Sequence, residues 1–173
     1  HDASVPTDGV WGDKSPGYIQ HLPLLTSVFP QCRVVHIVRD VRDYCLSIHK
    51  AWGKSMLRAA QRWTDRIEQV RTDAVEWGGP YLELRYEDLL AEPESTLHAV
   101  LEFLNVEWDP AVLNLSRSTE NLGDTRGKEG LVRDNMHKWE TNMEPSVQAR
   151  IEAIAGPTLH ALGYPVDHIG PAD

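Results

Sequence analysis

The stretch "RVVHIVRDVRDYCLSIH", residues 33–49, decides the fold. The run Val34–Val38 is short, mostly apolar and rich in β-branched residues, which is typical of a buried strand. The charged segment Arg39–Asp43 follows at once, and apolar residues then return at helical spacing. In an open parallel sheet, ligands bind where the carboxyl end of a strand meets the N-terminus of a helix. Free N–H groups and an arginine at such a junction favour an anion, so the sequence predicts an anion site here.

The residues after the strand predict a helix that begins at Asp40 and ends before Gly53. Asp40 fits an N-cap, and Asp43 is an acid in the first turn. Ser47 lies two turns in, on the same face as both aspartates. A guanidinium from Arg39 together with a hydroxyl suits a terminal phosphate or sulfate. The alternative is that Arg39 pairs with one of the aspartates and that Ser47 is a surface hydroxyl.

The rest of the chain predicts further helices and a second strand. The long apolar stripe in 55–77 has steps of four and three residues, as expected for a helix with one buried face. The other expected elements are a helix over 13–28 with a stripe of Leu24, Leu25 and Val28, a strand over 81–85, a helix over 94–104, a short helical piece after Asp109-Pro110, a loop over 116–138, and a helix over 145–162 interrupted at Gly156-Pro157.

This order of elements predicts the α/β class, with a parallel sheet flanked by helices. The 173 residues suit one domain, over 1–173. Two strands make a poor parallel sheet, however. We therefore expect the chain to be the C-terminal portion of its domain, without the first strand and loop.

Composition limits the partners. With a formal net charge of −9, a broad nucleic-acid-binding surface is not expected. The apolar runs are too short for a membrane span, and no signal peptide is visible, so a cytoplasmic location is the expectation, with N-terminal targeting information not visible. The eight histidines show no paired ligand spacing, which predicts no metal site. Cys32 and Cys45 are expected to be buried thiols. The oligomeric state is left open.

Two further residues are candidates for the site. Lys14, in "GDKSP", precedes an expected helix start, where its ammonium could stabilise developing negative charge. The alternative is a solvated lysine. Tyr86, in "LRYEDLL", follows the second strand directly, where its ring could stack on a flat group. The alternative there is a half-buried core tyrosine.

The long loop carries several cations and few apolar residues. A loop of this length within a domain is often functional, and its donors suit a flap over an anionic ligand. The alternative is a solvated loop whose own acids neutralise its cations. The residues concerned are Arg117, Ser118, Thr119, Arg126, Lys128, Arg133, Lys138 and Trp139.

The order of these motifs is more specific than any one of them. GDKSP, a strand with RDxRDxxxS, a strand with RYEDL, then RST, KW and LGY resemble the sulfotransferases that use 3′-phosphoadenosine-5′-phosphosulfate (PAPS). The resemblance runs from Gly12 to Tyr164 and is nearest to the tyrosylprotein sulfotransferases and related bacterial enzymes. It implies a P-loop-NTPase-like sheet and transfer of a sulfuryl group from PAPS to an acceptor hydroxyl or amine. The other product is 3′,5′-adenosine bisphosphate (PAP), and no metal is implied.

The resemblance also assigns roles to residues. Arg39 and Ser47, eight positions apart, match the pair that binds the 3′-phosphate. Tyr86 matches the tyrosine on the adenine side, and Lys14 matches a catalytic lysine. The positions that help to close over the nucleotide are Arg117, Ser118, Lys138 and Trp139.

Parts of the family pattern do not occur in this chain. The family begins with a strand, a glycine- and serine-rich loop around the 5′-phosphosulfate, and a helix that carries a glutamate base. The catalytic base and the acceptor therefore stay unassigned, and we expect the chain alone to be inactive. Two alternatives are a nucleotide kinase relative, although no Walker A motif is present, and a non-catalytic anion- or nucleotide-binding module.

Overall fold

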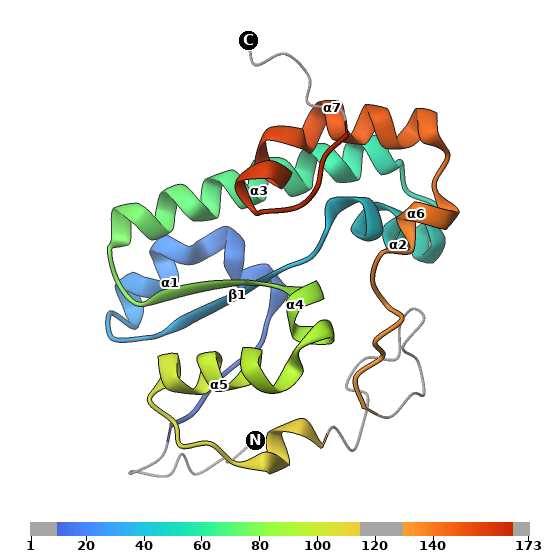
Figure 1. Ribbon diagram of the computed structural model, residues 1–173. Helices are drawn as coiled ribbons and strands as arrows, with labels where there is room; N and C mark the ends of the chain where they lie inside the picture. The colour runs from blue at the N-terminus through green and yellow to red at the C-terminus, as the bar shows by residue number, and fades with distance from the viewer. Residues whose placement is uncertain (1–9, 115–129, 168–173) are drawn as a thin grey trace.

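The structure is a computed structural model that describes residues 10–114 and 130–167 (Figure 1). Within these residues the sheet has two strands, β1 (Val34–Val38) and β2 (Tyr81–Arg85), which pair in parallel. Val34 lies opposite Tyr81, and Val38 lies opposite Arg85. Both strands have the predicted bounds, and the parallel sheet of the predicted α/β class is confirmed.

Two helices, α2 (Val41–Trp52) and α3 (Met56–Trp77), connect the strands. The Asp40 carboxylate accepts a hydrogen bond from the Arg42 backbone N–H at 2.8 Å, which confirms the predicted N-cap of α2. Gly53 ends this helix with a φ of 62°, a conformation that glycine adopts without a steric penalty. The predicted limits of both helices agree with the structure.

The main core lies where α2 and α3 pack against α7 (Pro145–Ala161), next to the carboxyl end of β1 (Figure 1). Its buried members are Val38, Val41, Cys45, Ala59, Ala60, Trp63, Ile67, Trp139, Met143, Ile151, Ala155, Leu159 and Tyr164. Burial raises the pKa of the Cys45 thiol to about 12, as expected of a buried thiol; Cys32 is only half-buried.

The predicted interruption of the last helix at Gly156-Pro157 is wrong. α7 continues through Pro157, which lies inside the helix on its exposed side. A proline removes the N–H that would bond to the carbonyl four residues earlier, that of Ala153. Ala153 is exposed too, so water can satisfy that carbonyl while the opposite face of α7 stays packed.

The apolar stripe predicted for the first helix is also wrong. A 3₁₀ helix, η1 (Pro16–His21), precedes α1 (Leu22–Val28). The face of α1 that is buried carries Leu22, which packs against α3, and Thr26 one turn later. Leu24 and Val28 lie on other faces and are 64% and 59% exposed.

The chain after β2 covers the other side of the sheet, where α4 (Tyr86–Ala91) leads into α5 (Pro93–Leu104) and then η2 (Pro110–Leu113) (Figure 1). Helix α4 was not predicted. Its first turn contains two acids, and Arg85 pairs with Asp88 at 2.6 Å, which favours a helix at this position. α6 (Trp139–Asn142) is a further short helix that was not predicted. No helix in the described ranges has the length and apolar character needed to cross a membrane.

Candidate functional site

The site lies at the carboxyl ends of the two strands. Because Val38 and Arg85 are opposite each other, the next residues, Arg39 and Tyr86, emerge side by side. The Arg39 guanidinium carbon lies 5.1 Å from the centre of the Tyr86 ring. The parallel register therefore brings together two of the residues that the sequence singled out.

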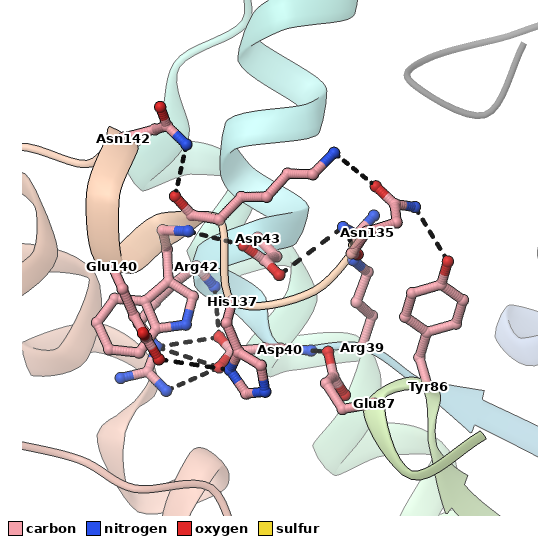
Figure 2. A network of polar contacts seen from close by, with 12 residues as sticks. Arg39, Asp40, Arg42, Asp43, Tyr86, Glu87, Asn135, His137, Glu140 and Asn142 are labelled. Carbon is pink, nitrogen blue, oxygen red and sulfur yellow. Dashed lines mark hydrogen bonds and ion pairs between the residues drawn. The ribbon is translucent and has the colours of Figure 1, made fainter. Parts of the chain in front are cut away.

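Asn135 joins these two residues to a third (Figure 2). Its backbone carbonyl accepts a hydrogen bond from Arg39 Nη2 at 2.8 Å. Its side-chain Nδ2 donates to Tyr86 Oη at 3.0 Å, and its Oδ1 accepts from Lys138 Nζ at 2.9 Å. Arg39, Tyr86 and Lys138 thus gather around one buried amide, at a position that none of the sequence motifs includes.

Asp43 attaches the Lys138 segment to α2. Its Oδ1 accepts a hydrogen bond from the Trp139 backbone N–H at 2.9 Å, and its Oδ2 lies 3.8 Å from Arg39 Nη2. Burial raises the pKa of the Asp43 carboxyl, although the Trp139 N–H and the Arg39 charge act in the opposite direction. The alternative interpretation of Arg39 is therefore correct in part: it pairs with Asp43, whereas Asp40 pairs with Arg42.

A buried ion-pair network lies beside the site, around Arg42. The guanidinium donates to Asp40 Oδ2 at 2.7 Å and to Glu152 Oε1 on α7 at 2.8 Å. It also stacks over the Trp139 ring, with 3.7 Å between the guanidinium carbon and the ring centre. Burial acts to lower the pKa of Arg42, but the two carboxylates outweigh it and raise the pKa. The network joins α2, α6 and α7.

A second buried connection joins three of the sequence motifs. Glu87, from RYEDL, accepts the Asp40 backbone N–H at 3.1 Å. Its other oxygen accepts a hydrogen bond from Tyr164 Oη at 2.7 Å, and the same hydroxyl lies 3.3 Å from the Val38 carbonyl. Burial first, and then the Glu87 charge, raise the pKa of Tyr164. The RD, YED and LGY motifs therefore meet at the end of β1.

Tyr164→Phe is expected to lower the free energy of unfolding at neutral pH by about 1–3 kcal/mol, because Glu87 loses a buried donor. The pKa of Tyr164 is raised above 10.0 in the folded protein, so its contribution is complete below that pH and is lost as the pH rises. The variant should therefore lose less stability than the wild type above pH 10. Denaturant unfolding from pH 7 to 11 measures both effects, with Tyr44→Phe as the control. If the free energy of unfolding falls with pH above 10 as steeply in Tyr164→Phe as in the wild type, this assignment is contradicted.

The site can hold an anion next to an aromatic ring. Arg39 and Lys138 supply two cations, and the Asp43 carboxylate offsets part of their charge. The buried Arg39 Nε has no hydrogen-bond partner within the described part of the chain. A phosphate oxygen would satisfy this donor, so the residues present fit a phosphorylated, flat ligand.

The other candidate residues are not among the contacts around Asn135. Ser47 is half-buried on α2, one turn beyond Asp43. Lys14 is exposed before η1 and takes no part in the contacts around Asn135. Arg117 and Ser118, with Thr119, Arg126 and Lys128, lie outside the described residues. Across 10–114 and 130–167, no group of three or more histidine, cysteine or acidic side chains could hold a metal ion.

Comparison with known proteins decides the family. A sequence model described as the sulfotransferase family matches residues 2–110. The chain belongs to the sulfotransferase family. This sulfotransferase chain is 26% identical over 172 residues to protein-tyrosine sulfotransferase 1 of Danio rerio, covering 88% of this chain and 47% of that protein. It is 24% identical over 169 residues to carbohydrate sulfotransferase 3 of Mus musculus, covering 82% of this chain and 36% of that protein.

Solved structures agree with this family. The sulfotransferase domain from the curacin biosynthetic pathway superposes with a TM-score of 0.66 at 20% identity, covering 89% of this chain and 62% of that domain. The likeness confirms the α/β sulfotransferase fold, and the resemblance inferred from the motifs is confirmed as well. The sulfotransferase chain spans about half or less of the length of the curated relatives it matches.

Proposed function

We propose that this chain carries the 3′-phosphate subsite of a PAPS-dependent sulfotransferase, which moves a sulfuryl group from PAPS to an acceptor hydroxyl or amine. The observation that carries the proposal is the position of Arg39. Its guanidinium lies at the carboxyl end of β1, against the Tyr86 ring, with a buried Nε that lacks a partner among the described residues. Arginine donates to phosphate through several N–H groups at once, which suits a terminal phosphate.

The surrounding side chains suit the remainder of the nucleotide. Tyr86 offers an aromatic ring for the adenine side, and Lys138, linked to the same asparagine, supplies a second cation. Ser47 is proposed as a hydroxyl donor to the 3′-phosphate from α2. The roles of Arg117 and Ser118 in closing over the nucleotide stay predictions from the family resemblance.

The proposed chemistry is an in-line transfer of the sulfuryl group from the 5′-phosphate oxygen of PAPS to the acceptor oxygen or nitrogen. The bond from sulfur to the 5′-phosphate oxygen breaks, a bond from sulfur to the acceptor atom forms, the acceptor proton passes to a base, and PAP leaves. As in phosphoryl transfer, the protein contributes mainly position and charge. Lys14 is proposed to stabilise the negative charge that develops on the transferring group or its leaving oxygen.

Peptide, phenol and sugar acceptors are all candidates for the proposed transfer. The relatives include a protein-tyrosine and a carbohydrate sulfotransferase, whose acceptors differ. A panel of tyrosyl peptides, phenols and sugars, assayed with labelled PAPS and the full-length protein, would identify the acceptor class.

Arg39→Ala is the direct test of the 3′-phosphate subsite. We expect it to weaken PAP binding by about 1.5–3 kcal/mol, as for loss of hydrogen bonds to a charged group. Calorimetry with PAP, AMP, and ATP with Mg²⁺ measures this, and Arg62→Ala, an exposed arginine of α3, is the matched control.

Three outcomes are informative. Wild-type protein that prefers PAP to AMP, combined with loss of that preference in Arg39→Ala, supports the subsite. Unchanged PAP affinity in a folded Arg39→Ala protein contradicts it. Preference for ATP with Mg²⁺ over PAP would favour the kinase alternative.

A further inference from the structure

Asn135 occupies an unusual place in this site. It lies in the segment between η2 and α6, outside any helix or strand, yet it is only 9% exposed. Its backbone carbonyl, its side-chain oxygen and its side-chain nitrogen each contact a different residue, namely Arg39, Lys138 and Tyr86. Those three are the residues of the proposed nucleotide subsite that the structure brings together.

The partners fix the orientation of the Asn135 amide. A lysine ammonium can only donate, so Oδ1 must face Lys138 Nζ and Nδ2 must face Tyr86 Oη. The two side-chain hydrogen bonds hold the residue, and with it the backbone carbonyl that accepts from Arg39 Nη2 (Figure 2). The asparagine amide thus supplies an acceptor toward Lys138 and a donor toward Tyr86.

This arrangement also determines which Arg39 donors remain for a ligand. The Asn135 carbonyl engages Nη2, whereas Nε has no partner within the described residues. The guanidinium is therefore held through Nη2, while its buried Nε is left without a partner among the described residues. A guanidinium that is already oriented loses less conformational freedom when a phosphate binds.

We propose that Asn135 is a positioning residue, which sets Arg39, Tyr86 and Lys138 in the arrangement that recognises the 3′-phosphate of the nucleotide. The inference rests on the proposed function and deepens it. Asn135 acts through these three side chains rather than by touching the phosphate itself.

The test compares binding of PAP and AMP, which differ by the 3′-phosphate. In Asn135→Ala, we expect the ratio of the AMP to the PAP dissociation constant to fall about 10-fold, the effect of losing hydrogen bonds that position a charged group. In Asn114→Ala, an exposed asparagine after η2, the ratio should equal that of the wild type. When Asn135→Ala is added to the Arg39→Ala variant, PAP affinity should change by less than about threefold, because the guanidinium that Asn135 positions is gone.

Asn135→Asp is the second variant and is nearly isosteric. Its carboxylate keeps an acceptor toward Lys138 but places a negative charge beside the phosphate subsite, so the ratio should fall further than in Asn135→Ala. Because its shape is almost unchanged, it carries the test if the alanine variant does not fold.

The outcomes separate this inference from the proposed function. If the wild type binds PAP no better than AMP, the proposed function is wrong and the inference fails with it. If the wild type discriminates but neither Asn135 variant changes the ratio, only the role of Asn135 is overturned. If Asn135→Ala weakens PAP and AMP binding equally and lowers the melting temperature, Asn135 has a general structural role. That result would also overturn its proposed role as a positioning residue.

Discussion

Replacing Arg42 by alanine is expected to lower the free energy of unfolding by about 3–5 kcal/mol. The Arg42 side chain is 1% exposed, and it pairs with the carboxylates of Asp40 and Glu152, which are equally buried. Removing the cation takes away the charge partner that Asp40 and Glu152 share in the interior, although Glu152 keeps its hydrogen bond from Gln148 Nε2 at 3.0 Å. It also uncovers the indole ring of Trp139. The loss reflects uncompensated charge more than lost packing.

Chemical denaturation at neutral pH measures this loss. The matched control is Arg62→Ala in α3, an exposed arginine whose removal should change stability by less than about 0.5 kcal/mol. Adding Glu152→Gln to Arg42→Ala should restore part of the loss, because one of the two buried carboxylates is then replaced by a neutral amide. If Arg42→Ala alone lowers the free energy of unfolding by less than about 1 kcal/mol, the role of the network is contradicted.

The second large effect is on turnover. We propose that Lys14 acts mainly on the transition state, so Lys14→Ala in the full-length enzyme should reduce kcat by about 10²–10³-fold, as for loss of one donor to a developing oxyanion. PAP affinity should change little, since the proposed 3′-phosphate subsite is at Arg39. The control is Lys54→Ala, another exposed lysine.

Steady-state kinetics at saturating donor, together with PAP titration, tests this role. A fall in kcat with unchanged PAP binding supports it. A variant with normal kcat but weaker PAP binding would instead assign Lys14 to nucleotide binding, and a variant equal to Lys54→Ala in both would make it a solvated surface lysine.

The parts of the fold that depend on local patterns could be predicted. The strand Val34–Val38, the cap at Asp40 and the stop at Gly53 are each determined by a few adjacent residues, and all agree with the structure. His36 in the middle of β1 is 8% exposed, and its Nδ1 lies 2.6 Å from Tyr81 Oη on the neighbouring strand. The junction of strand and helix was therefore visible from the sequence.

The parts of the fold and of the site that depend on contacts between distant residues could not be predicted from the sequence. Glu152 reaches Arg42 from α7, and no spacing rule connects these two positions. Asn135 lies in a segment without apolar periodicity, where an asparagine usually indicates only a turn. The continuation of α7 through Pro157 depends on which face of the helix is buried, and the proline motif alone suggests a break.

The parallel pairing of β1 with β2 has a consequence for the kinetics of folding. The strands are separated in the chain by the whole of α2 and α3, so their pairing closes a long loop and is slow compared with helix formation. Arg39 and Tyr86 each follow directly on a paired strand, and they meet only once the register is correct. A slip of one residue would turn the side chains of one strand to the opposite face. During refolding, the proposed nucleotide binding should therefore appear later than the helical circular dichroism signal, at the rate at which β1 and β2 pair.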